Sequence, residues 1–146
     1  MTGVQTCALP IFQRLAEFEL EALTECWRAA RACLPLINAT RPVDSGTSVD
    51  VLQADAGRLS DAHNKLIEAV GRHELFLSAP IVETLDAIGG VLRLELSNIC
   101  VHEPFKGDWW EKGEKNRIEF QRLNDMLLGL VKARVVELRA KAAEES

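Results

Sequence analysis

Apolar residues recur at spacings of three and four along four separate stretches of this 146-residue chain. Such spacing places side chains on one face of an α-helix, which turns once every 3.6 residues. The first stretch shows it most simply, with Leu15, Phe18, Ala22, Cys26, Ala29 and Cys33. No stretch alternates apolar and polar residues with the period of two that is typical of a half-buried strand. The pattern therefore predicts an all-α fold.

Four helices are predicted, over residues 12–38, 48–72, 78–102 and 108–142. Pro35 is expected to end or kink the first helix, because its ring removes a backbone donor and clashes with the preceding turn. Short connections between amphipathic helices favour antiparallel neighbours. We therefore predict an antiparallel four-helix bundle.

Residues 1–11 carry no charge and show no helical periodicity. They are similar to the translation of a common short-read sequencing adapter, whose codons give Thr2 through Ile11 in order after a GTG start. A segment of that origin is not natural protein and is set apart in predicting the fold. We expect residues 12–146 to form a single helical-bundle domain, the C-terminal part of a longer protein. A membrane anchor or targeting signal upstream of residue 12 stays open.

Setting Cys7 apart leaves three cysteines, Cys26, Cys33 and Cys100. Cys26 and Cys33 are two turns apart on one helix face, a separation of roughly 10 Å at the usual rise per residue. A disulfide needs Cα atoms within about 7 Å. We therefore predict that these two thiols are buried and unbridged, as in a reducing compartment such as the cytoplasm.

Composition narrows the class of partner. The net charge is -5 and aromatic residues make up 5% of the chain, with no tyrosine, which argues against nucleic acid. No run of roughly 18 apolar residues, the length of a membrane span, is present. We expect a protein partner, either another chain or a second copy in a homo-oligomer.

No arrangement of residues favours catalysis or metal binding. His63 and His73 are ten positions apart and His102 follows the third helix, so no metal site and no cofactor are predicted. The enzyme alternative would use Glu95, Cys100 and His102 between helices. Another alternative is a small ligand bound in the bundle core beside Glu95. A non-catalytic role is preferred, because the end of a helix disfavours a thiolate at Cys100.

Candidate residues for an interaction or structural cluster include the tryptophans, which are enriched at interfaces. Trp109 and Trp110 are adjacent and cannot both face the same core, so one is expected to pack against the loop after His102 and the other to be partly exposed. The full set of candidates is Trp27, Asn64, Phe76, Trp109, Trp110, Asn116 and Arg117.

Three stretches together resemble a family of uncharacterised bacterial helical-bundle proteins. They run from Trp27 to Arg41-Pro42, from Ala62-His63-Asn64-Lys65-Leu66 to Phe76-Leu77, and from Trp110-Glu111-Lys112 to Glu114-Lys115-Asn116-Arg117. The family often has Asn-Arg-Pro-Phe where this chain has His73-Glu74-Leu75-Phe76. The resemblance implies a membrane anchor or coiled-coil stalk followed by a cytosolic bundle, and it implies no activity. The expected function is a structural or protein-interaction module, tethered through missing upstream sequence.

Overall fold

The computed structural model of the chain describes residues 2–40, 49–100 and 107–145, with side chains from Ile11 onward except those of Phe12 and Glu145. The elements in chain order are α1 (Thr2–Ala39), α2 (Val49–His73), the short 3-10 helix η1 (Glu74–Phe76), α3 (Ala79–Cys100) and α4 (Trp109–Glu145). The described residues contain no strand. The predicted all-α fold with four helices is confirmed.

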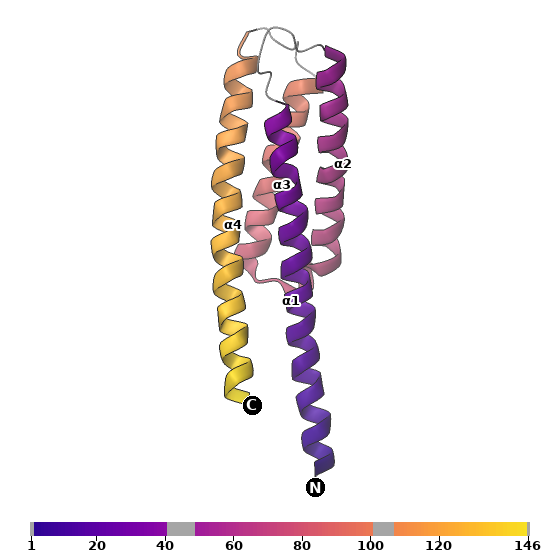
Figure 1. Ribbon diagram of the computed structural model, residues 1–146, viewed down its shortest axis with the longest axis vertical. Helices are drawn as coiled ribbons and strands as arrows, with labels where there is room; N and C mark the ends of the chain where they lie inside the picture. The colour runs from indigo at the N-terminus through magenta and orange to yellow at the C-terminus, as the bar shows by residue number, and fades with distance from the viewer. Residues whose placement is uncertain (1, 41–48, 101–106, 146) are drawn as a thin grey trace.

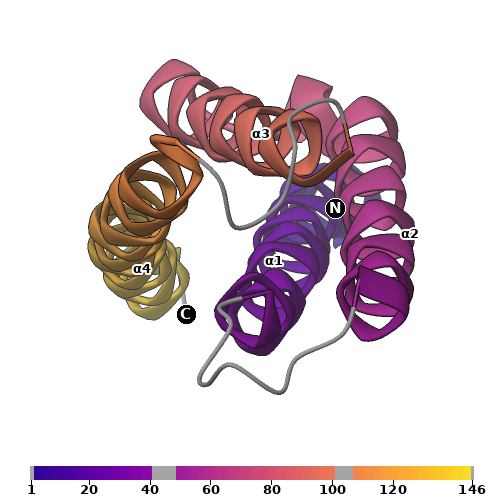
Figure 2. The same cartoon turned by 90° about the horizontal axis from the view of Figure 1, so that it is seen from above.

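Each helix packs against its neighbour in the sequence, and α1 also packs against α4, which closes a ring of four (Figures 1 and 2). Successive helices run in opposite directions, as in an antiparallel bundle. The start of α1 and the end of α4 lie at the same end of the bundle as η1, which connects α2 to α3.

The core runs along the axis of this ring. Its largest fully buried side chains include Leu23, Ile37, Leu59, Leu66, Leu85, Ile88, Leu92, Phe120 and Leu127, drawn from all four helices. Burying a side chain of this size contributes about 1.5–3 kcal/mol relative to leaving it in water. The apolar stripes in the sequence thus supply the stabilising contacts of the bundle.

The structure differs from the prediction along α1. The helix continues through Pro35 and ends at Ala39, one residue beyond the predicted end, so Pro35 does not end it. Proline removes one helical hydrogen bond, but Cys33 and Ile37 on either side of it are fully buried, and their packing holds the turn in place. The helix also begins at Thr2 instead of residue 12, because extending a formed helix avoids the cost of nucleation. The origin of residues 1–11 stays a prediction.

The helices have unequal lengths, which decides where a surface is left open. α1 and α4 have 38 and 37 residues, whereas α2 and α3 have 25 and 22. At the end of the bundle that holds the termini, α1 and α4 therefore run on past η1 (Figure 1). We call this the open end. None of the described helices is long and apolar enough to cross a membrane.

Candidate functional site

The structure divides the predicted site residues between separate places. Trp109, Asn116 and Arg117 lie at the start of α4, where they meet α3. Trp110 stands beside Trp109, with their rings edge to face at 5.2 Å. Trp109 is buried and Trp110 is 44% exposed, so one of the pair is partly exposed as expected, whereas the loop after His102 lies outside the described residues.

The other three candidates lie elsewhere in the bundle. Trp27 on α1 is partly buried against the main core, and Asn64 on α2 is exposed. Phe76 belongs to η1, at the open end. The seven residues therefore do not form a single cluster.

Asn98 joins the end of α3 to the start of α4. Its Nδ2 donates to Glu95 Oε1 at 3.2 Å and to the carbonyl of Trp109 at 3.1 Å. In return, Nε1 of Trp109 donates to the carbonyl of Asn98 at 3.1 Å. All three side chains are buried, and these bonds replace part of what the polar groups lose with water; among the described residues, Asn98 Oδ1 and Glu95 Oε2 find no hydrogen-bond partner.

Glu95 is the most deeply buried charged side chain of this cluster, with 1% of its surface exposed. Arg117 Nη1 lies 3.7 Å from its Oε2, and Arg117 also pairs with Glu114. Burial raises the pKa of Glu95, while the bond from Asn98 and the charge of Arg117 oppose that shift. A Cβ at Gly113 would stand 3.2 Å from Arg117 Nη1, so glycine leaves room for the guanidinium. We call Glu95, Asn98, Trp109 and Arg117 the clamp, because their contacts join α3 to α4.

The enzyme alternative placed Glu95 together with Cys100 and His102. Glu95 is buried, whereas Cys100 is exposed. His102 lies outside the described residues, so the convergence of all three stays a prediction. A groove of about 260 Å³ lies beside the clamp, lined by Asn98, Asn116, two lysines and two other residues of α3.

The two remaining described histidines are buried and lie apart. His63 faces Gly89 of α3, where a Cβ would lie 3.8 Å from the Nε2 atom. His73 Nε2 contacts Glu25 Oε2 of α1 at 2.5 Å, and this bond lowers the pKa of Glu25. Among the described residues, no group of three or more His, Cys, Asp or Glu side chains is placed to hold a metal ion.

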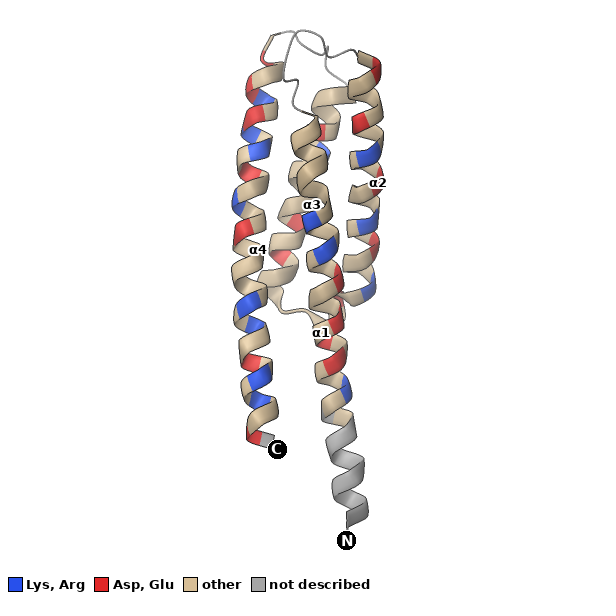
Figure 3. Ribbon diagram, viewed as in Figure 1, with Lys and Arg blue, Asp and Glu red and all other residues tan. Residues whose placement is uncertain are grey.

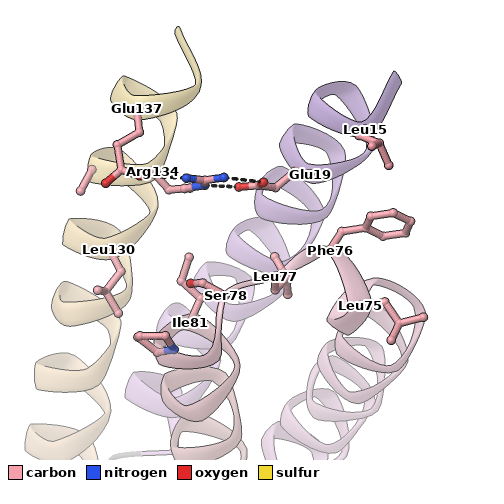
Figure 4. Close-up of a pocket in the computed structure, with 12 residues that line it drawn as sticks. Leu15, Glu19, Leu75, Phe76, Leu77, Ser78, Ile81, Leu130, Arg134 and Glu137 are labelled. Atoms are coloured by element: carbon pink, nitrogen blue, oxygen red, sulfur yellow. Dashed lines mark hydrogen bonds and ion pairs between the residues drawn. The ribbon is translucent and has the colours of Figure 1, made fainter. Parts of the chain in front are cut away.

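A larger cleft, of about 550 Å³, opens at the open end between α1, η1, the start of α3 and α4. Its lining includes Leu15, Leu77, Ile81 and Leu130. Figure 4 shows Arg134 reaching from α4 to Glu19 of α1 across this cleft. Arg134 Nη1 also donates to Glu137 at 2.8 Å, so one guanidinium serves two carboxylates.

An exposed apolar patch borders this cleft, formed by Leu15 and Phe18 of α1 together with Leu75 and Phe76 of η1. Leu75 is 91% exposed, and Leu15 is 50% exposed. The rings of Phe18 and Phe76 pack at 5.5 Å between centroids, which joins the two halves of the patch. Contiguous exposed apolar patches of this kind mark interaction sites.

The predicted site contained Phe76 but missed the other three members of the apolar patch. One sequence signal pointed to them. The fourth predicted helix was ten residues longer than the second and third, so part of it had no short helix to pack on. In an antiparallel bundle the start of the first helix lies beside the end of the fourth, which places Leu15 and Phe18 at the same level as that extension.

Comparison with known protein families, with curated proteins and with solved structures finds no match to this chain. The resemblance noted in the sequence therefore stays a prediction.

Proposed function

We propose that this chain is a non-catalytic protein-interaction module that binds its partner at the open end. The supporting observation is that the core-forming stripe of α1 continues past the ends of α2 and α3. Ala22 and Cys26 on this stripe are buried, whereas Leu15 and Phe18, earlier on the same stripe, are exposed. A partner that covers Leu15 and Phe18 buries apolar surface of α1, just as the bundle core buries Ala22 and Cys26.

The open end has the composition of a protein interface. The apolar patch supplies large side chains, and the Glu19–Arg134 pair supplies a charged border. Interfaces combine an apolar centre with a polar rim in this way. Full burial of each large apolar side chain contributes about 1.5–3 kcal/mol to binding. The loss of translational and rotational entropy of the two partners opposes this gain.

Two further observations support a non-catalytic role inside the cell. The carboxylate of Glu95 is engaged by Asn98 and faces Arg117, which suits a structural part better than a reactive one. Cys26 and Cys33 are free and buried, which suits the reducing cytoplasm. A membrane tether through upstream sequence rests on the resemblance alone.

Site-specific photo-crosslinking tests the proposal. A photoreactive amino acid replaces Leu75 in the full chain, which is then expressed and irradiated in cells. The matched control carries the same residue at Ile118, which is 63% exposed on α4. We expect a protein adduct from position 75 and none, or far less, from position 118.

The mass of the adduct separates the two classes of partner. A band at twice 16.2 kDa indicates a second copy, and any other mass indicates a different protein. Equal yields of adduct from both positions, or no adduct from position 75, would contradict docking at the open end.

A further inference from the structure

We infer that the chain forms a parallel homodimer, in which the outer face of α4 pairs with the same face of a second copy as a short coiled coil. This contact is separate from the proposed function, because the seam lies on α4 whereas the apolar patch lies on α1 and η1. It follows from a second apolar stripe on α4, from a glycine within that stripe, and from the order of the charges beside it.

A second apolar stripe runs along the part of α4 that reaches towards the open end. Its members, all of them exposed, are Met126, Gly129, Ala133, Val136 and Ala140. Their spacing alternates between three and four residues, which is the heptad pattern of a coiled coil with apolar residues at positions a and d. The a positions are Met126, Ala133 and Ala140, and the d positions are Gly129 and Val136. The bundle core uses another face of α4, on which Leu123 and Leu127 are buried.

Gly129 lies inside this stripe and inside the helix, where glycine is unfavourable. It destabilises a helix by about 1 kcal/mol relative to alanine. Among the described residues, a Cβ added at Gly129 would meet no atom within 4 Å, so the packing of this chain does not require glycine there. A second helix on this face gives the glycine a role, because a residue without a side chain lets another backbone approach closely.

The charges beside the stripe point to a second copy as the occupant. Acidic and basic residues both lie along this part of α4 (Figure 3). In the heptad register of the stripe, Lys132 and Arg139 take g positions, and Glu137 and Glu144 take e positions. In a parallel coiled coil, the g residue of one helix lies beside the e residue of the following heptad of its partner. Two copies of α4 therefore bring Lys132 beside Glu137 and Arg139 beside Glu144, on both sides of the seam.

The same charges disfavour an antiparallel pair. There, g positions lie beside g positions and e positions beside e positions. Lysine would face arginine and glutamate would face glutamate, and like charges in an interface cost affinity. All four side chains are exposed. Among the described residues, Lys132, Arg139 and Glu144 form no ion pair within the chain, whereas Glu137 pairs with Arg134.

The seam begins at Met126. In the preceding heptad, the a and d positions are Glu119 and Arg122, which pair with each other on the surface of one copy. Charged residues at these positions do not pack into an apolar seam, so the two helices separate there and Ile118 lies outside the contact. A short seam is sufficient, because the bundle already holds α4 as a helix and the dimer does not have to nucleate it.

The dimer leaves the apolar patch uncovered. Ala133 and Glu137 border the cleft at the open end, but the patch lies across this cleft, on α1 and η1. A parallel pair of α4 helices also places both open ends at the same end of the dimer. The two apolar patches are therefore presented in one direction.

Disulfide cross-linking of the full chain tests the contact and its direction. Cys7 and Cys100 are first replaced by serine, whereas Cys26 and Cys33 are buried and stay in place. One new cysteine is then introduced in each of three proteins. Mild oxidation is followed by electrophoresis without reductant, which shows a covalent dimer as a band at twice 16.2 kDa.

Met126→Cys and Ala140→Cys should each give the dimer band, because in a parallel seam every a position faces its own counterpart. Ala54→Cys is the matched control, at an exposed alanine of α2, and should give no band. An antiparallel pair would instead give a dimer band only when the Met126→Cys and Ala140→Cys proteins are mixed.

Charge reversal tests the g–e contacts by analytical ultracentrifugation. One variant carries Lys132→Glu and Arg139→Glu, and the other carries Glu137→Lys and Glu144→Lys. Each brings like charges together at every g–e contact, so each alone should dimerise at least about tenfold more weakly than the natural chain. An equal mixture of the two should regain the lost affinity, because each copy then supplies the charge that the other lacks.

Val136→Glu tests the apolar seam and should weaken dimerisation by a similar factor. Ile118→Glu is the matched control and should leave it unchanged. The natural side chains are 65% and 63% exposed, so neither substitution removes a core contact.

A natural chain that stays monomeric at every concentration overturns the inference, as does a dimer that Val136→Glu leaves intact. Cross-linking at position 54 equal to that at positions 126 and 140, or bands only from the mixed proteins, would also refute the parallel seam. These results leave the proposed function standing, because the photo-adduct from position 75 tests the open end separately.

Discussion

Arg134, near the end of α4, donates hydrogen bonds to both carboxylate oxygens of Glu19, which lies 115 positions earlier on α1. The bond from Nη2 to Oε1 measures 2.9 Å, and the two side chains are only 26% and 19% exposed. This pair joins the two helices where they run past η1, at the cleft of the open end.

Glu19→Gln and Arg134→Gln are each expected to lower the free energy of unfolding by up to about 1 kcal/mol, since partly exposed ion pairs contribute at that scale. The double variant should lose less than the sum of the single losses, because both substitutions remove one interaction. Urea denaturation of the four proteins measures the coupling. Additive losses would show that the pair contributes nothing.

Trp109→Phe is expected to destabilise the bundle by about 1 kcal/mol, because it removes the donor to the carbonyl of Asn98 while keeping an aromatic ring. The matched change, Trp110→Phe, affects a half-exposed ring and should have a smaller effect. Thermal denaturation compares the two variants. An equal or larger loss from Trp110→Phe would argue against the clamp between α3 and α4.

The cysteines should differ sharply in reactivity. Burial raises the pKa of both Cys26 and Cys33 to about 11, so neither forms a thiolate at neutral pH, whereas Cys100 is exposed. A thiol reagent should modify Cys100 at once, and should modify Cys26 and Cys33 only as the protein unfolds. Mass spectrometry of peptides after brief labelling locates the adducts, and labelling in urea serves as the control. Rapid modification of Cys33 in the native protein would contradict the packing of α1.

The stability contributed by Glu95 should grow as pH falls. Because burial raises its pKa above the ordinary value of 4.5, the folded protein binds this proton more tightly than the unfolded chain. The resulting stabilisation is complete below pH 4.5 and is lost as pH rises through the raised pKa. Relative to Glu95→Gln, the natural chain should therefore gain stability on acidification. Urea midpoints of both proteins across this range test it, and a constant difference would refute it.

His63 should have the opposite effect. Desolvation, followed by the charge of Arg93, lowers its pKa from 6.5, so the unfolded chain binds this proton more tightly. The stability it provides is present above pH 6.5 and is lost as pH falls through the lowered pKa. Relative to His63→Gln, the natural chain should lose stability over that window. The same urea measurements decide the sign, and a gain would show that the imidazole is not buried as a neutral group.

The fold was predictable because each helix carries its own periodic stripe. The predicted ends of the last three helices lie within one to three residues of the structural ends, since loop residues and glycines flank these helices. The end of α1 at Ala39 also lies one residue from its predicted end, but its start at Thr2 lies ten residues before the predicted start. Residues 1–11 show no apolar periodicity, so the sequence pattern does not predict that the helix extends into them.

The clamp and the apolar patch were less predictable, because each depends on how the helices pack against one another and where they end. Glu95 lies among leucines, and the sequence left open whether it faces solvent or another helix. Its partner Arg117 is 22 positions later on α4, so only the packing of α3 on α4 determines the pair. Leu15 looks like any other core position in its stripe. It becomes exposed because η1 turns the chain back before α2 reaches that level.

Because α1 starts and α4 finishes at the same end of the bundle, the molecule has an asymmetric response to mechanical load. Tension applied between those two points does not shear the full length of the α1–α4 contact. It instead separates the two helices one turn at a time, beginning at the end where the force is applied. The Glu19–Arg134 ion pair lies near that end, so it breaks before the core contacts of Phe120 come under load.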